Sequence, residues 1–401
     1  MSLPGPESSL RPHRIGRGAA LTVLFATVLA TAAVTDCLPR DATPPRAARS
    51  GPPAAPLSRA GAVRDQVFRA AVEAAADGKP VAQAAEEVVS RSGDRWGVVY
   101  DRGEYEDFRR ALDGAYTGVG LWARRTADGH VEVARVQRGG PAERAGLRPG
   151  DRLRTVDGRS VRGCAAAEVV ALLRGDGADG DGGARAEAGS VVVLGVQRGA
   201  RAWTLTLRRA RLAVEAVTVR RVGDAVLIRI SAFTRGSGDQ VRRAVDRAPD
   251  GAGVLLDLRG NGGGLVTEAV VAASAFLDGG LVATYDVHGE ERALYAEPGG
   301  DTERPLVALI DGGTTSAAEL LTGALKDRGR AVTVGARTFG KGSVQMPSSL
   351  PGGSVAELTV GHYRTPAGAR VDGRGITPDV PAPTRAEERA RTVLSGLGTG
   401  A

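Results

Sequence analysis

Residues 307–319 read Val-Ala-Leu-Ile-Asp-Gly-Gly-Thr-Thr-Ser-Ala-Ala-Glu: an apolar run, a glycine turn and the start of a helix. A short, uninterrupted aliphatic run predicts a strand that is buried on both faces. The glycine pair allows a tight turn before the helix. Strand, turn and helix in this order are the unit from which layered α/β folds are built.

The alternation of strands and helices continues on both sides of this stretch, over residues 213–385. It predicts a layered α/β unit. The expected buried strands are Ala225–Ile230, Gly253–Asp257, Leu306–Ile310 and Ala331–Val334. The expected helices are Gly238–Arg247, Thr267–Phe276 and Thr315–Asp327. From Thr384 on the pattern returns to a polar helix and a Gly-ended tail, and residues 386–401 are the C-terminal tail.

Residues 116–212 have a different pattern, with short β-type runs at Val131–Val136, Val191–Val196 and Ala202–Leu207. Between the runs, the Gly- and Asp-rich stretch 174–188 predicts a flexible insertion. That stretch lacks the glutamate that a calcium loop places at its bidentate position, so we expect no calcium there.

In the order of these segments, residues 116–212 resemble a PDZ domain, a β-rich module with two helices. The resemblance assigns a short helix to Pro141–Leu147 and the carboxylate-binding loop to Gly118, Val119, Gly120 and Leu121. Adjacent glycines let backbone N–H groups converge on the terminal carboxylate of a peptide, which adds as a strand to a sheet edge.

Three segments precede this region. Residues 62–115 show helical spacing and predict a small helical region. Residues 38–61, rich in Pro, Ala and Arg, predict a disordered linker. Residues 1–37 combine a basic start with an uncharged run at 18–34, which is typical of a signal peptide or an N-terminal membrane anchor. We therefore expect an extracytoplasmic protein, either secreted or attached to the membrane. Asp36 stands where a lipoprotein site needs a small residue, so lipidation of Cys37 is not expected.

The composition is basic, with a net charge of +7 and a pI near 9.9. The arginines alternate with acidic residues along the chain and do not form a block with aromatic residues, which argues against nucleic-acid binding. Only three lysines are present, Lys79, Lys326 and Lys341. A site that needs a lysine therefore has few candidates.

Ser316 follows the glycine turn at the start of the expected helix. There its hydroxyl can act as a nucleophile, and the N–H groups of the helix start can stabilise an oxyanion. From this segment alone, a plain helix cap is an equally good interpretation.

Lys341 lies in the segment Gly335–Gln345, which nearly matches the phosphate-binding motif G-x-x-x-x-G-K-[ST]. Gly342 replaces the hydroxyl residue that this motif requires, so a nucleotide site is disfavoured. A lysine whose pKa is lowered by burial can instead take the proton of a serine. An arginine could not, because it keeps its proton in proteins.

Histidine is the usual alternative base. His13 lies in the leader and His130 in a turn, and neither His288 nor His362 has a catalytic signature around it. A Ser-His-Asp triad is therefore disfavoured. A third feature is the strand that ends in the glycine run 260–264, because such a loop can bring main-chain N–H groups to a developing negative charge.

Together these segments resemble the C-terminal processing peptidases, or tail-specific proteases, of the S41 serine peptidase family. The resemblance covers about residues 90–382. Its motifs are Asp257–Gly264, Thr315–Glu319, Thr338–Gln345, Tyr363–Gly368 and Gly373–Asp379. It implies a layered core like that of ClpP and crotonase, into which the PDZ domain is inserted.

The resemblance also implies the catalytic roles. Ser316 is the nucleophile, Lys341 its base and Gln345 the residue that orients the lysine. The N–H groups of Ala317 and Gly263 form the oxyanion hole. No metal or cofactor is implied.

We therefore expect a serine endopeptidase that cleaves proteins near their C-termini and uses the PDZ domain to bind those ends and to gate its activity. The alternative is a catalytically silent PDZ adaptor. Protein or peptide substrates are the expected partners, together with the membrane if the N-terminal segment is retained. Self-association into a homo-oligomer stays open.

Overall fold

The computed structural model describes residues 59–398, apart from 127, 165, 176–185 and 288–289. The expected leader and most of the expected linker lie outside the described residues, as do Cys37 and His288. The chain forms two compact units: a smaller one of Thr117–Leu212, and a larger one made from the segments before and after it. No helix in the described part of the chain is long and apolar enough to cross a membrane.

A six-stranded sheet forms the centre of the larger unit, with the strand order β10-β11-β12-β15-β16-β19. Within this sheet, neighbouring strands from β11 through β12, β15 and β16 to β19 are parallel, and β10 lies antiparallel at one edge. The central strands are almost entirely aliphatic, as parallel strands covered on both faces must be. The strands are β10 (Val217–Val222), β11 (Ala225–Ile230), β12 (Val254–Asp257), β15 (Leu306–Ile310), β16 (Val332–Gly335) and β19 (Val380–Pro381).

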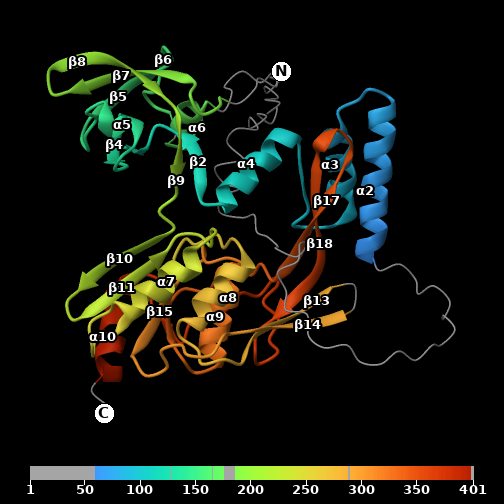
Figure 1. The fold of residues 1–401 in the computed structure, drawn as a ribbon, viewed down its shortest axis with the longest axis vertical. Helices are drawn as coiled ribbons and strands as arrows, with labels where there is room; N and C mark the ends of the chain where they lie inside the picture. Colours follow the sequence, from blue (N-terminus) through green and yellow to red (C-terminus); the bar gives the residue numbers. More distant parts are fainter. Residues whose placement is uncertain (1–58, 127, 165, 176–185, 288–289, 399–401) are drawn as a thin grey trace, which may run out of the picture. The chain divides into compact units, whose positions relative to one another are not determined.

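Alternate residues of these strands face two hydrophobic clusters on opposite sides of the sheet. Ile228 and Leu256 pack with the helices of one side, whereas Leu255 and Val307 pack with Leu394 on the other. The first side carries α7 (Ser237–Asp246), α8 (Val266–Ser274) and α9 (Ala317–Asp327), and the second carries α10 (Ala386–Gly398). Figure 1 shows α7, α8 and α9 beside one another on the sheet. The polar helix expected after Thr384 is thus α10, and it covers the sheet.

A second sheet of the larger unit joins the two ends of the chain. Its order is β1-β18-β13-β14, with β17 also paired to β18. The helices α2 and α3 pack on it through Val67, Ala71 and Val89. The strands are β1 (Val98–Tyr100), β13 (Leu281–Val287), β14 (Glu290–Tyr295), β17 (Ser343–Ser349) and β18 (Val355–Arg364). The N-terminal helices are α2 (Arg59–Ala76), α3 (Val81–Ser92) and α4 (Arg102–Leu112).

The smaller unit is an antiparallel sheet in the order β3-β4-β5-β7-β8, and β6 pairs with β5. Its core contains Val131, Leu153, Val169 and Leu194. The chain enters and leaves this unit through the paired strands β2 (Ala115–Gly118) and β9 (Ala210–Ala213). The other elements are β3 (Leu121–Arg125), β4 (Val131–Val136), α5 (Pro141–Arg144), β5 (Arg152–Val156), β6 (Arg159–Ser160), α6 (Ala166–Arg174), β7 (Val191–Arg198) and β8 (Arg201–Arg208).

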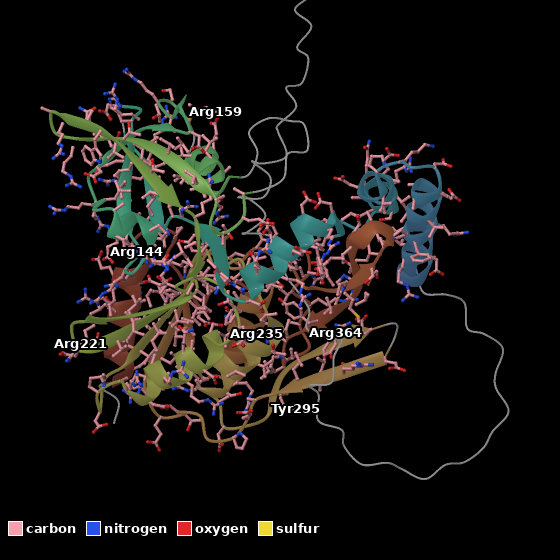
Figure 2. The ribbon with its side chains drawn as sticks, turned by 45° about the horizontal axis from the view of Figure 1, so that its top comes forward. Arg144, Arg159, Arg221, Arg235, Tyr295 and Arg364 are labelled. Atoms are coloured by element: carbon pink, nitrogen blue, oxygen red, sulfur yellow. The ribbon has the colours of Figure 1, made fainter. Side chains whose placement is uncertain are left out.

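The arginine excess is spread over many elements of both units. In Figure 2, Arg144 and Arg159 project from the smaller unit, and Arg221, Arg235 and Arg364 from the larger one. These five residues belong to different helices, strands and loops.

Candidate active site

Ser316 occupies the N-cap position of α9, where the loop after β15 turns into the helix. Its backbone has φ 55° and ψ −111°, a conformation that side-chain-bearing residues rarely adopt. Such strain persists only where the surroundings enforce it, and it is frequent at functional sites. Here Glu319 accepts the Ser316 N–H at 2.8 Å, and the hydroxyl of Tyr363 donates to the Ser316 carbonyl at 3.1 Å. The cap and the proposed nucleophile are thus the same position.

The glycine loop after β12 lies against the serine loop, because β12 and β15 are neighbouring parallel strands. The N–H of Thr315 donates to the Asn261 carbonyl at 2.9 Å. The N–H of Gly260 donates to the Asp311 carboxylate, also at 2.9 Å. These bonds join the two loops that the sequence predicted to meet.

The lysine loop, between β16 and β17, is tied to the serine loop by one carboxylate. Glu319 is fully buried and accepts four hydrogen bonds. Its Oε2 accepts the N–H groups of Ser316 and Lys341, at 2.8 and 2.9 Å. Its Oε1 accepts the Thr338 hydroxyl at 2.5 Å and the Gly340 N–H at 2.7 Å. Because both N–H groups donate to the same oxygen, Glu319 Oε2 holds the backbone nitrogens of Ser316 and Lys341 close together.

The same contacts explain the likeness of this loop to a phosphate-binding loop. A phosphate loop presents adjacent N–H groups to an anion. In this protein the N–H groups of Gly340 and Lys341 already bind an anion, the carboxylate of Glu319. Gly342 has a steric role, because a Cβ at this position would clash with the backbone nitrogen of Asp372. The loop is thus built around an internal carboxylate.

Lys341 is 1% exposed. Its Nζ lies 5.3 Å from the centroid of the Trp96 indole, within cation–π range. Burial lowers the pKa of Lys341 to about 8, against the opposing effect of the acidic groups of Glu357, Asp94 and Asp372. A lysine with this pKa is partly neutral near neutral pH and can accept a proton.

Gln345 is fully buried on β17. Its Nε2 donates to the backbone carbonyl of Trp96, the same residue whose ring faces Lys341. Its Oε1 has no hydrogen-bond partner among the described residues. Trp96 therefore contacts both Lys341, the expected base, and Gln345, the residue expected to orient it.

Glu357 is a second buried carboxyl group close to the lysine. It lies on β18 and is 3% exposed, and no residue in the described part of the chain forms a hydrogen bond with its Oε2. Burial raises its pKa to about 7, while the nearby Lys341 acts in the opposite direction. In the β17–β18 register Glu357 is opposite Pro347 and Thr359 is opposite Gln345, so Glu357 and Gln345 belong to the same face of the sheet.

His362 lies at the edge of this region. Its side chain is 42% exposed, and its Nε2 is 3.7 Å from an oxygen of Asp372. The other oxygen of Asp372 accepts the Trp96 Nε1–H at 3.3 Å and the Gly342 N–H at 3.2 Å. The histidine is thus a surface neighbour of the lysine loop.

The two residues expected to form the oxyanion hole lie in different settings. Ala317 is the first residue of α9, where N–H groups lack partners within the helix. The N–H of Gly263 donates to the Asn261 Oδ1 at 2.7 Å. In this structure the Gly263 amide is therefore held by its own loop.

The expected carboxylate-binding loop joins β2 to β3. The carbonyls of Val119 and Gly120 accept the N–H groups of Ala142 and Gln137, each at 2.8 Å. In a trans peptide the N–H points opposite to the preceding C=O. The N–H groups of Gly120 and Leu121 therefore point away from the α5 segment. β3, which continues this loop, is at the edge of its sheet, where a peptide can add as a further strand.

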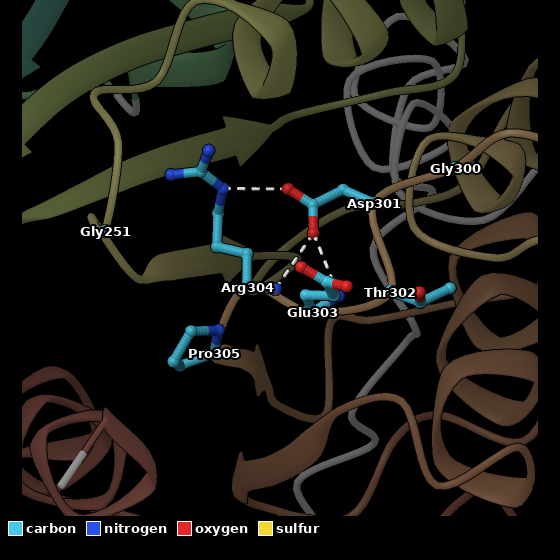
Figure 3. Close-up of a pocket in the computed structure, with 7 residues that line it drawn as sticks. All are labelled: Gly251, Gly300, Asp301, Thr302, Glu303, Arg304 and Pro305. Atoms are coloured by element: carbon cyan, nitrogen blue, oxygen red, sulfur yellow. Dashed lines mark hydrogen bonds and ion pairs between the residues drawn. The ribbon is translucent and has the colours of Figure 1, made fainter. Parts of the chain in front are cut away.

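The pocket shown in Figure 3 lies elsewhere, between Gly251 and the turn 300–305. Arg304 donates to Asp301 at 2.9 Å and to the carbonyls of Pro249 and Ala252. These contacts anchor a surface turn, and none of the predicted site residues lines this pocket.

The sequence prediction missed three contributors to the site. Glu319 stands within the serine motif, three residues after Ser316, the spacing of a capping box. That spacing was a signal that could have been used. Trp96 and Glu357 gave no local signal, because they reach Lys341 only through the pairing of β1, β18 and β17.

Two regions of the chain are similar to known protein families. Residues 224–382 match the model of peptidase family S41, and residues 132–179 match a PDZ domain model. The "Probable CtpA-like serine protease" of Staphylococcus aureus is 33% identical over 291 residues, which cover 69% of this chain and 54% of that protein. The "C-terminal processing peptidase, chloroplastic" of Tetradesmus obliquus is 38% identical over 298 residues, which cover 68% of this chain and 61% of that protein.

The chain thus spans little more than half the length of these relatives. Among solved structures, one described as an S41 protease of Bacteroides fragilis matches with a TM-score of 0.52 and 16% identity. The match covers 80% of this chain and 91% of that one, and it supports the fold alone.

Proposed function

Because the chain carries a peptidase family S41 domain and a PDZ domain, we propose that it is a serine endopeptidase that cleaves protein substrates near their C-termini. The observation that carries this proposal is the shared carboxylate of Glu319. Its Oε2 accepts from both the Ser316 and the Lys341 N–H groups, and so joins a strained serine to a buried lysine.

The proposed reaction uses Lys341 in its neutral form. Lys341 Nζ takes the proton from Ser316 Oγ as the oxygen attacks the scissile carbonyl carbon, which gives a tetrahedral oxyanion. The N–H of Ala317 and one N–H of the glycine loop stabilise this charge. Gly263 can take part only if its N–H leaves Asn261, to which it donates in this structure.

The oxyanion then collapses, the C–N bond breaks, and the Lys341 ammonium returns its proton to the leaving amine. The acyl group stays on Ser316 Oγ until a water molecule, deprotonated by Lys341, attacks it. The second tetrahedral oxyanion collapses, the bond between Ser316 Oγ and the acyl carbon breaks, and the Lys341 ammonium returns its proton to Ser316 Oγ. The products are two peptides, and the enzyme is regenerated. Gln345 serves as the residue that orients the lysine.

The PDZ domain is proposed to bind the C-terminal carboxylate of the substrate at Gly118–Leu121 and to gate the activity. The outward N–H groups of Gly120 and Leu121 and the open edge of β3 support this assignment. The protein is further proposed to act outside the cytoplasm, on the basis of the leader expected at residues 1–37.

The test uses purified protein and an unstructured substrate with a free C-terminus. Ser316→Ala and Lys341→Ala should each abolish cleavage and leave binding of the substrate tail intact. Lys79→Ala is the matched control, because Lys79 is an exposed lysine in an ion pair with Asp77. If both active-site variants cut as fast as the parent protein, the mechanism is wrong. If the parent protein binds tails and never cuts, the chain is an adaptor.

A further inference from the structure

Trp96 is the residue of the N-terminal region that contacts the most parts of the site. It lies between α3 and β1, outside every segment to which the sequence assigned chemistry. Its ring faces the Lys341 ammonium at 5.3 Å, and its carbonyl accepts from the Gln345 amide. Its Nε1–H donates to Asp372, which also accepts the Gly342 N–H.

The indole itself is held in place. The Phe339 ring lies 5.7 Å away at 54°, and the Arg95 guanidinium lies 4.6 Å from the indole centroid. The N–H of Trp96 donates to the Asp94 carboxylate at 3.1 Å, and the same carboxylate accepts from Thr359 on β18. The ring is thus anchored on β18 and on the lysine loop at once.

From these contacts we infer that Trp96 is a positioning residue for the proposed base: it holds the Lys341 ammonium against its ring and the Gln345 amide against its carbonyl. This inference rests on the proposed function. The ring acts on the charged form of the lysine, because the electron-rich face of an indole attracts a cation. It therefore opposes the burial that favours the neutral form.

The sign of the expected effect follows from this balance. Removing the ring while keeping the site apolar takes away a contact that favours the ammonium, so the pKa of Lys341 should fall. The other charged and titratable groups around the pair are Asp94, Arg95, Glu357, His362 and Asp372. A leucine at position 96 changes none of these residues, but it removes the Nε1–H that donates to Asp372 and the ring beneath Arg95, and Trp96→Phe separates the loss of the Nε1–H from the loss of the ring.

The first experiment compares pH profiles of kcat/KM for the full chain. Trp96→Leu should lower kcat about tenfold, with little change in KM. It should also move the acid limb of the profile down by about 0.5–1 pH unit. Trp96→Phe keeps an aromatic ring, so the acid limb of its profile should lie close to that of the parent protein. Trp203→Leu is the matched control: it removes an indole 5.4 Å from Arg198 in the smaller unit and should leave the profile unchanged.

A second experiment does not depend on cleavage. The chain has three tryptophans, so a Trp122→Phe, Trp203→Phe variant in a Ser316→Ala background reports on Trp96 alone. Its fluorescence should titrate with a midpoint near pH 8, and Lys341→Met should remove this transition.

The two readouts separate the possible failures. If the fluorescence transition near pH 8 is present and the parent protein does not cleave the substrate, the proposed function is refuted. The pairing of Trp96 with Lys341 then still holds. A transition that persists in Lys341→Met, or none at all, overturns the pairing. A loss of activity in Trp96→Leu by the same factor at every pH reduces Trp96 to a structural residue.

Discussion

Replacing Glu319 by glutamine tests whether one carboxylate joins the two catalytic loops. The amide keeps a single acceptor oxygen in place of two. If that oxygen continues to serve Thr338 and Gly340, the new NH₂ group faces the N–H groups of Ser316 and Lys341. Two hydrogen bonds to a charged acceptor are then lost, and two buried donors are left without a partner.

The magnitude follows from these contacts. A hydrogen bond to a charged group contributes roughly 1.5–3 kcal/mol, so the two bonds amount to roughly 3–6 kcal/mol. Part of this is offset, because the neutral amide does not need to be stripped of water as a carboxylate does. Burial raises the pKa of Glu319, which shows that this desolvation is considerable. We expect a net loss of about 3 kcal/mol in the free energy of unfolding. We also expect kcat/KM to fall by at least about 100-fold, because the serine and lysine lose their alignment.

The assay combines urea denaturation with cleavage of an unstructured peptide and with labelling of Ser316 by a serine-directed phosphonofluoridate. Glu268→Gln is the matched control. Glu268 also accepts two backbone N–H groups, those of Gly236 and Gly238 at 2.8 Å, but it holds the start of α7. The Glu268→Gln substitution should lower the stability of the protein and leave the turnover of the folded protein unchanged. Glu319→Gln activity within about threefold of the parent protein, or equal losses in both variants, would refute the reasoning.

Four further predictions concern three single positions. Proteolysis should rise with pH through about 8, because the pKa of Lys341 is lowered to about 8 and only the neutral amine accepts a proton; a pH–rate profile checks this. Burial lowers the pKa of Lys341 from 10.5 to about 8 and so disfavours its charged form in the folded protein; Lys341→Met should therefore raise stability by roughly 3 kcal/mol at pH 7 and by much less at pH 10.5, as thermal unfolding at the two pH values would show. The pKa of Glu357 is raised to about 7, so its contribution to stability is present below pH 4.5 and lost as pH rises through 7; Glu357→Gln should raise the melting temperature at pH 8 and not at pH 4. Gly120 has φ 77°, so Gly120→Ala should cost about 1–2 kcal/mol in the smaller unit and weaken tail binding, measured by fluorescence anisotropy of a labelled peptide.

The sequence predicted the central sheet well, because its strands are continuous aliphatic runs. β11 and β15 have the expected bounds, and β12 and β16 differ by one residue at one or both ends. β1 was missed, since three residues give no period and its pairing with β18 is not local.

The site residues were predicted unevenly, because only some of them carry a local sequence signal. Ser316 and Lys341 carry local motifs, and the structure ties their backbones together through Glu319. The roles of Trp96 and Glu357 depend on which strand lies beside which, and no spacing along the chain encodes that. Gly263 was chosen by family resemblance, which could not reveal that its N–H donates to Asn261.

The carboxylate of Glu319 also bears on when the protein becomes active. Its four donors come from the start of α9 and from the loop after β16, and they meet only once the two strands before them, β15 and β16, are paired. A chain whose core is still incomplete has a serine and a lysine, but nothing that holds them in register. A nascent or partly unfolded molecule would therefore be harmless to itself and to its neighbours. Under the proposed mechanism, completion of the core is therefore the step that brings the serine and the lysine into register.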